Sequence, residues 1–295
     1  MEFGWVIQPS SRAGLRMNEL MEQNRRFLRL LSGKFVSAWV EDHFQWDNRD
    51  TLECWTTLTF LASEFREYVW GPLVLGQSYR NPALIAKMAA NLYALTNGRM
   101  VFGIGAGWKK DEYLAYGYDF PRASVRIEQL EEAVQIIRAL WTQAPATFQG
   151  KYYHIEKAYC EPRPNPMPPF MIGGSGEQKT LRVVAHYADW WNGSFQPPEE
   201  YARKLAALRK HCDEMGRDFD SIRKTYFGFV SLSDDPGKLV KRDDLYVISG
   251  NATQVTQTLE QFRTLGVEFA ILRFLDFPDT RGAEIFLESV LPHLR

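Results

Sequence analysis

Short apolar runs alternate with longer segments whose apolar residues recur at helical spacing, and this alternation continues along most of the chain. The runs that we predict to be strands are 3–8, 35–39, 68–75, 99–104, 170–172, 189–192, 224–232 and 267–275. The run 68–75 is almost wholly apolar, which is typical of a parallel strand covered on both faces. About eight strands, each followed by a helix, predict an α/β fold of the TIM (β/α)8 barrel type. A chain of 295 residues is long enough for one such barrel with insertions.

The middle of the chain interrupts this alternation. A turn-rich link at 117–121 precedes an amphipathic helix over 127–141, and the segment 146–155 alternates around Gly150 as a hairpin does. Five prolines between 160 and 169 favour an extended crossover. We therefore predict a single domain, residues 1–295, with an insertion at about 109–168.

A charged and aromatic cluster, residues 40–46, follows the predicted strand 35–39 directly. Barrels of this type carry their chemistry at the carboxyl ends of the strands. His43 is the one histidine in such a place, and an imidazole exchanges protons near neutral pH. A second interpretation is equally open, in which Asp42 caps a turn and His43 is a hydrogen-bonded packing residue.

Two glycine-rich segments lie at strand ends. Residues 103–108 are not a dinucleotide-binding motif, because Trp108 stands where glycine or alanine is required, although glycines here let a ligand approach the backbone. Residues 173–176 lie between a predicted strand and a helix, where backbone amides bind anions. They lack the lysine of a P-loop, and Glu177 prevents a match to the nucleophile elbow of hydrolases. We predict a phosphate site at 173–176, with a plain tight turn as the alternative.

Charge and composition exclude several classes of protein. A formal net charge of -1, without basic runs, argues against nucleic-acid and membrane-surface partners. Three cysteines far apart in the sequence and histidines without ligand spacing predict neither a disulfide framework nor a metal site. No apolar run is long enough to span a membrane and no signal peptide is recognisable, so we expect a cytoplasmic protein. An aromatic content of 14% is compatible with a pocket for a flat apolar ligand or simply with a ring-filled core.

Taken together, these segments resemble the bacterial luciferase-like flavin oxidoreductases, and within them the branch that uses the deazaflavin coenzyme F420. The resemblance rests on the order and spacing of 42–46, 78–87, 98–108, 117–121, 148–153, 173–176 and 188–191. It implies a (β/α)8 barrel, an insertion that shields the cofactor, and a homodimer.

The resemblance also implies roles for individual residues. The cofactor ring would rest against Leu73 and Val74, where relatives often carry a cis peptide bond. His43 would move the proton that accompanies hydride transfer, Trp46 would close the pocket, and Asp42 would influence the imidazole tautomer. The implied cofactor-binding residues are Asp42, Leu73, Val74, Gly105, Ala106, Gly107, Gly173, Gly174, Ser175 and Gly176.

Two departures from the family pattern bear on the substrate. Sugar-phosphate dehydrogenases of this branch have a glutamate where Trp108 stands, and a lysine near Phe195 to Pro197, so a sugar phosphate is disfavoured. Trp108 and Trp191 suggest a small hydrophobic or aromatic substrate for an F420-dependent hydride transfer. The alternatives are an FMN-dependent monooxygenase that uses O2, with a separate reductase recycling the cofactor, and a flavin-binding protein without catalysis.

Overall fold

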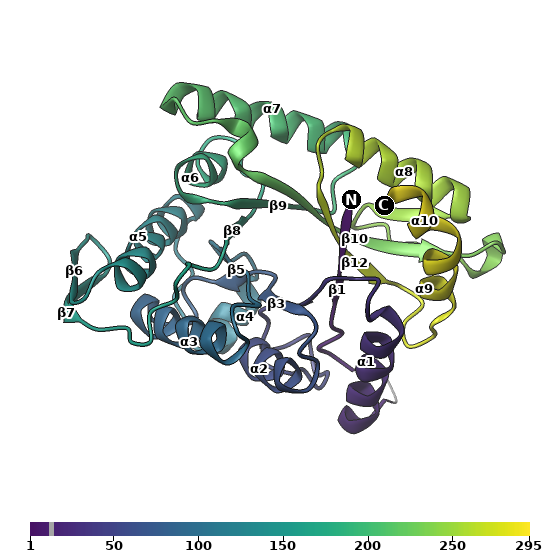
Figure 1. Ribbon diagram of the computed structural model, residues 1–295, viewed down its shortest axis with the longest axis horizontal. Helices are drawn as coiled ribbons and strands as arrows, with labels where there is room; N and C mark the ends of the chain where they lie inside the picture. The colour runs from purple at the N-terminus through teal and green to yellow at the C-terminus, as the bar shows by residue number, and fades with distance from the viewer. Residues whose placement is uncertain (12–14) are drawn as a thin grey trace.

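The computed structural model describes residues 1–11 and 15–295 and contains a parallel β-barrel surrounded by helices (Figure 1). Neighbouring strands follow the order β3-β2-β1-β12-β10-β9-β8-β5-β4. The strands are β1 (Glu2–Val6), β2 (Ser37–Val40), β3 (Val69–Pro72), β4 (Leu75–Gly76), β5 (Phe102–Gly105), β8 (Phe170–Gly173), β9 (Trp190–Ser194), β10 (Arg223–Leu232) and β12 (Phe269–Phe274). The predicted barrel is confirmed.

The barrel closes between β3, β4 and β5. The Trp70 amide donates to the Arg99 carbonyl at 3.0 Å, and a parallel bridge joins Trp70 to Met100. β3 and β4 together form one strand of the barrel, which is interrupted at Leu73 and Val74. The peptide bond between these two residues is cis. A short strand that the sequence pattern did not predict, β11 (Val247–Gly250), pairs with β10 outside this closed path.

Helices follow most of the barrel strands, as predicted, and α5 contains the predicted helix 127–141. Their starts have local causes: Asn81 caps α3 directly before Pro82, and Asn251 forms a capping box with Gln254 at the start of α8. The helices are α1 (Met17–Leu31), α2 (Cys54–Glu64), α3 (Pro82–Leu95), α5 (Ala123–Thr142), α6 (Thr180–Tyr187), α7 (Pro198–Met215), α8 (Ala252–Thr264), α9 (Arg281–Ile285) and α10 (Leu291–Leu294), with a π-helical turn (Phe286–Val290) before α10.

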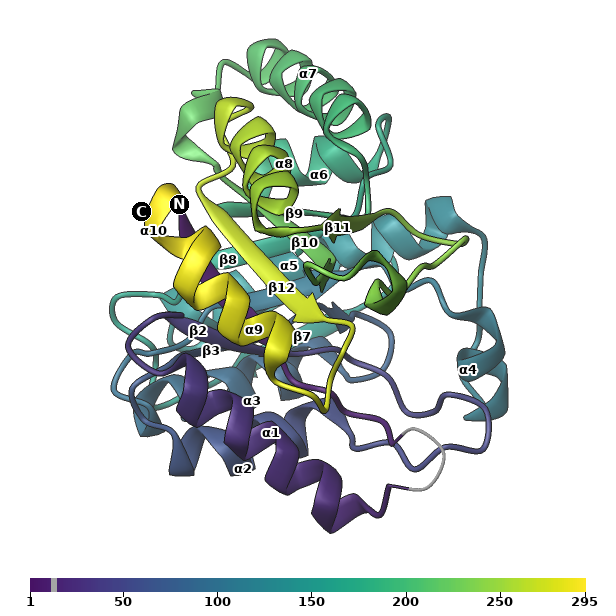
Figure 2. The same ribbon diagram turned by 90° about the vertical axis from the view of Figure 1, so that its right-hand side faces the viewer.

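The segment between β5 and β8 carries the elements that interrupt the alternation. Besides α5 it contains the hairpin β6 (Ala146–Gln149) and β7 (His154–Ala158), which lies outside the main sheet as predicted. It also contains an unpredicted short helix, α4 (Lys110–Ala115). In Figure 2, α4 lies on the side of the molecule toward which the arrow of β12 points, away from the marked chain ends. The segment therefore reaches the carboxyl ends of the barrel strands.

Two separate apolar cores fix the barrel. The outer core packs the strands against the helices, and the inner core fills the barrel with Val6, Trp39, Val101, Met171, Phe227 and Ile271. Adjacent tryptophans on β9 belong to different cores, Trp191 to the outer one and Trp190 to the margin of the inner one. Successive side chains on a strand point to opposite faces, which explains this division. None of the helices in the described ranges has the length and apolar character that a bilayer crossing requires.

Candidate active site

A cavity of about 1040 Å³ opens at the carboxyl ends of the strands. Cavities that bind one small ligand measure roughly 300–1,000 Å³, so this cavity lies at the upper end of that range and is large enough for a cofactor-sized ligand. Most of the residues predicted from the sequence line it, namely Asp42, His43, Trp46, Leu73, Val74, Gly105, Ala106, Gly107, Trp108, Gly173 and Gly174. The structure thus brings together residues from four separate segments of the chain.

His43 follows β2 and lies at the cavity wall with 8% of its surface exposed. Its Nδ1 is 3.1 Å from Oε2 of Glu112, a residue of α4. Because a carboxylate can only accept, Nδ1 carries the hydrogen, and Nε2 is the atom able to exchange a proton with a ligand. The imidazole is therefore oriented as a proton-transfer residue needs to be, which is the first of the two interpretations of His43.

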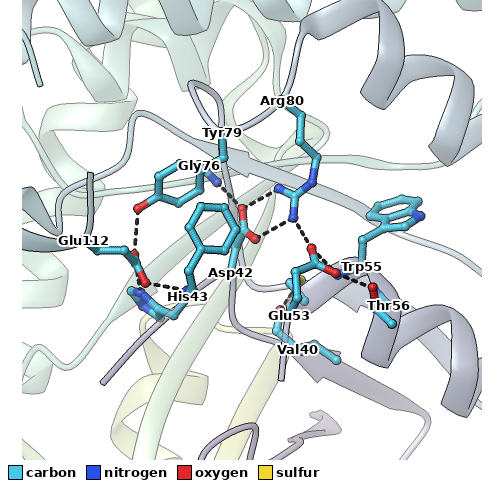
Figure 3. A network of polar contacts seen from close by, with 12 residues as sticks. Val40, Asp42, His43, Glu53, Trp55, Thr56, Gly76, Tyr79, Arg80 and Glu112 are labelled. Carbon is cyan, nitrogen blue, oxygen red and sulfur yellow. Dashed lines mark hydrogen bonds and ion pairs between the residues drawn. The ribbon is translucent and has the colours of Figure 1, made fainter. Parts of the chain in front are cut away.

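Glu112 was missed in the sequence, although it organises this part of the site (Figure 3). Its carboxylate is fully buried and accepts hydrogen bonds from the amides of Phe44 and Gln45 and from the Tyr79 hydroxyl at 2.7 Å, besides its contact with His43. Burial alone would raise the pKa of Glu112, but the hydrogen bonds from His43 and Tyr79 lower it below its ordinary value. Glu112 is therefore an anion that holds the loop after β2 against α4.

The Asp42 carboxylate serves a different network (Figure 3). It accepts from the Gly76 amide at 2.9 Å and from both terminal nitrogens of Arg80, at 2.9 and 3.0 Å. Arg80 also pairs with Glu53, which caps α2. Glu112, not Asp42, contacts the imidazole, so the prediction that Asp42 influences the His43 tautomer is wrong. Asp42 joins the ends of β2 and β4 instead.

Val74 forms part of the cavity wall between β4, β5 and β8. A Cβ added at Gly105 would lie 2.9 Å from Val74 Cγ2, and one added at Gly173 would lie 2.8 Å from the same atom. Both distances are too short for a real contact, so glycine at these two positions makes the space that the Val74 side chain occupies. The result is a small apolar surface at the mouth of the barrel.

The glycine turn after β8 forms another part of the wall. Gly174 has a φ of 123°, which favours glycine, and α6 begins at Thr180, so three residues separate the glycine turn 173–176 from the helix. Gly173, Gly174 and Thr180 line the cavity. Ser175 accepts from the Gln196 side chain at 2.5 Å and, with Gly176, lies beside the lining residues.

The predicted tryptophans have different surroundings. The Trp46 and Trp108 rings lie 4.6 and 5.7 Å from the imidazole of His43, between centroids, and Trp108 is 66% exposed. Trp191 is fully buried, stacks on Tyr201 at 4.9 Å and donates to the Gly174 carbonyl at 2.9 Å. The prediction of Trp191 in the substrate pocket is wrong, because its side chain points to the outer face of β9; it supports the glycine turn.

Arg126 is a second cavity residue that the sequence did not reveal. It lies on α5, is 8% exposed, and has its guanidinium 3.9 Å from the Phe120 ring centroid. Its Nε donates to the Gly107 carbonyl at 3.4 Å, and Nη1 contacts the Pro121 carbonyl. No carboxylate forms an ion pair with it within residues 1–11 and 15–295. Its charge is therefore available to an anionic ligand.

A closed parallel barrel with a ligand-sized cavity at the strand ends places the protein among the (β/α)8 barrels that bind ligands at that face. Residues 1–268 match the family model described as luciferase-like monooxygenase. The chain belongs to the luciferase-like monooxygenase family.

Relatives of known activity are similar over most of this chain. The F420-dependent glucose-6-phosphate dehydrogenase of Amycolatopsis mediterranei is 33% identical over 279 residues, which cover 88% of this chain and 82% of the relative. The enzyme of the same name from Kineococcus radiotolerans is 31% identical, over 70% of this chain and 62% of its own length. The F420-dependent hydroxymycolic acid dehydrogenase of Mycobacterium tuberculosis is 27% identical, over 77% and 63%. The chain thus spans less than two thirds of the last two.

Solved structures share the fold. An F420-dependent secondary alcohol dehydrogenase in complex with an F420-acetone adduct superposes with a TM-score of 0.85 at 21% identity, covering 100% of this chain and 99% of the other. The F420-dependent tetrahydromethanopterin reductase of Methanopyrus kandleri gives 0.84 at 17% identity, with the same coverage. These two comparisons establish the barrel independently of the sequence pattern.

Proposed function

We propose that this protein is an F420-dependent oxidoreductase that transfers a hydride between the deazaflavin and a small organic substrate. The observation that carries the proposal is His43, whose Nδ1 is held by a buried carboxylate at the cavity wall. The F420-dependent relatives named above support the choice of cofactor. The FMN alternative has support from barrels of the same fold, such as a type II Baeyer-Villiger monooxygenase of Pseudomonas putida in complex with FMN, which has a TM-score of 0.77.

The cavity residues fit a flat cofactor with an anionic tail. Val74, in the space made by Gly105 and Gly173, provides an apolar surface for a ring system. The Gly174 amide donates to the Asn192 carbonyl, so we assign the phosphate donors to the amides that follow it in the turn, at Ser175 and Gly176, and to the Arg126 guanidinium. A bound deazaflavin supplies the carbon that accepts or donates the hydride.

His43 is the residue that we expect to move the accompanying proton. With Nδ1 bound to Glu112, Nε2 either gives a proton to the substrate or takes one from it. Trp46 and Trp108 cover the imidazole and exclude water from it. The substrate would then exchange the hydride with the ring and the proton with the imidazole.

Two further features agree with the proposed cellular location and oligomeric state. Three free, buried cysteines agree with a reducing cytoplasm. Exposed apolar residues on α2 and α3, Phe60 and Leu95, agree with a homodimer formed through barrel helices. A separate reductase would recycle the cofactor.

The cofactor is tested by titrating the purified protein with the deazaflavin and, separately, with FMN, following ring absorbance. We expect micromolar binding of the deazaflavin and much weaker binding of FMN. A preference for FMN would favour the oxygen-using alternative, and binding of neither would refute the proposal. Turnover with any electron donor or acceptor excludes a purely binding role.

Binding of the cofactor phosphate by Arg126 can be tested separately. Arg126→Gln should weaken binding of the phosphorylated deazaflavin about 10- to 100-fold, since a hydrogen bond to a charged group contributes roughly 1.5–3 kcal/mol. Binding of the deazaflavin riboside without phosphate should stay the same. Arg138→Gln, on the same helix but outside the cavity lining, is the matched control. Equal losses for both ligands would show that Arg126 does not bind the phosphate.

A further inference from the structure

One side of the cavity is a wall of three phenylalanines. Phe195 follows β9, and Phe227 and Phe229 lie on β10. The Phe195 ring centroid is 4.6 Å from that of Phe227 and 4.7 Å from that of Phe229. Phe227 and Phe229 belong to the inner barrel core, and Phe195 packs against it. A flat apolar ligand can therefore pack against this wall without leaving apolar surface in water.

Four charged groups border the same wall. Arg273, on β12 beside Phe229, has its guanidinium 5.7 Å from the Phe229 ring centroid, and its Nη2 is 2.6 Å from a Glu41 oxygen. Both side chains of this ion pair are close to nine-tenths buried. Arg242, 5.4 Å from the same ring, forms two hydrogen bonds with Asp244, at 2.9 and 2.6 Å. Two guanidiniums thus face two carboxylates, and their charges cancel.

This cancellation decides which ligands are bound favourably. An anion that leaves water for an apolar cavity needs an uncompensated cation, because its desolvation is costly. At Arg273 an anionic ligand would meet the Glu41 carboxylate, and like charges in contact at a binding site cost several kcal/mol. A neutral ligand meets no such repulsion and keeps the contact with the rings.

We propose that Glu41 determines the charge preference of the substrate side of the cavity, so that it accepts neutral, flat, unsaturated compounds and rejects anionic ones. This role of Glu41 rests on the proposed function, because only that function makes the bound compound a substrate. Glu41 acts by neutralising Arg273, and this pair is shielded from solvent. The Asp244 side chain is 63% exposed, so water already screens its charge.

The test compares two ligands with the same ring system, neutral 2-naphthaldehyde and anionic 2-naphthoate, by isothermal titration calorimetry on the deazaflavin-saturated protein. The wild type should bind the aldehyde at least about tenfold more tightly than the carboxylate. Glu41→Gln should tighten binding of 2-naphthoate about tenfold and change binding of the aldehyde less than about twofold. Asp244→Asn, the matched control, should change either ligand less than about threefold.

The reciprocal variant keeps the test decisive if Glu41→Gln fails to fold. Arg273→Gln leaves the Glu41 carboxylate uncompensated, so a cationic naphthylmethylammonium ion should bind more tightly and 2-naphthoate less tightly than to the wild type. Unchanged selectivity in both variants, or a larger effect from Asp244→Asn, would overturn the assignment. Failure of the deazaflavin to bind would refute the proposed function separately, and the same titrations on the cofactor-free protein would still test Glu41.

Discussion

His43→Ala should lower the rate of hydride transfer about 10²- to 10⁴-fold, the usual contribution of a general acid or base. The expectation follows from the place of His43 in the cavity wall, where the contact of Nδ1 with Glu112 leaves Nε2 as the atom able to exchange a proton. Binding of the deazaflavin should change less than about threefold, since the imidazole is not among the groups proposed to hold its tail. The measurement is single-turnover absorbance of the deazaflavin with the neutral substrate that the wild type uses fastest.

The matched control for this variant is His154→Ala, because His154 is exposed on β7 outside the cavity lining. It should keep the wild-type rate. If His43→Ala also kept the full rate, the second interpretation of His43, a hydrogen-bonded packing residue, would hold. The proton would then have to come from water or from another group.

Glu112→Ala should lower the free energy of unfolding by about 3–5 kcal/mol, because it leaves buried donors of four residues without their acceptor. Glu112→Gln keeps the shape and one acceptor oxygen, but its NH₂ group would face the Nδ1 hydrogen of His43. We therefore expect a smaller loss of stability than in the alanine variant and a clear loss of rate. Urea unfolding and single-turnover kinetics measure the two effects.

The stability provided by Glu112 should also depend on pH. The pKa of Glu112 is lower in the folded protein than its ordinary value of 4.5. A carboxylate of this kind stabilises the fold fully above pH 4.5, and the contribution is lost as the pH falls through the folded pKa. The difference in unfolding free energy between wild type and Glu112→Gln should therefore be largest near pH 7 and shrink below pH 4.5. Glu156→Gln, at an exposed position, should show no such dependence; a difference that stayed constant with pH would contradict the role of the anion.

The regular part of the fold could be predicted because its signals are long. Helices such as α5 and α7 contain several turns of apolar spacing, and most of the barrel strands are continuous apolar runs. The short helix α4 has six residues and no side-chain cap, so its sequence shows neither a full apolar period nor a start signal. The four residues of β11 follow a polar loop and were missed for the same reason.

The site could be predicted only where residues adjoin a strand end. His43 and Trp46 follow β2 directly, and the glycine turns follow β5 and β8. Glu112 sits in the polar run 109–112, which looks like an exposed surface, and only tertiary contacts make it buried. The error over Trp191 arose because an adjacent pair of tryptophans does not reveal which member faces the barrel interior.

The position of Glu112 has a consequence for how this barrel can change during evolution or engineering. The carboxylate belongs to the middle third of the chain, whereas its partners His43 and Tyr79 belong to loops of the first third. Exchanging the segment between β5 and β8 for one without an equivalent carboxylate would deprive His43 of its support, although no residue around the imidazole had been altered. The loops that carry His43 and Tyr79 and the segment that carries Glu112 therefore have to be inherited together. We expect a chimaera that combines them from different parents to lose the chemistry of both.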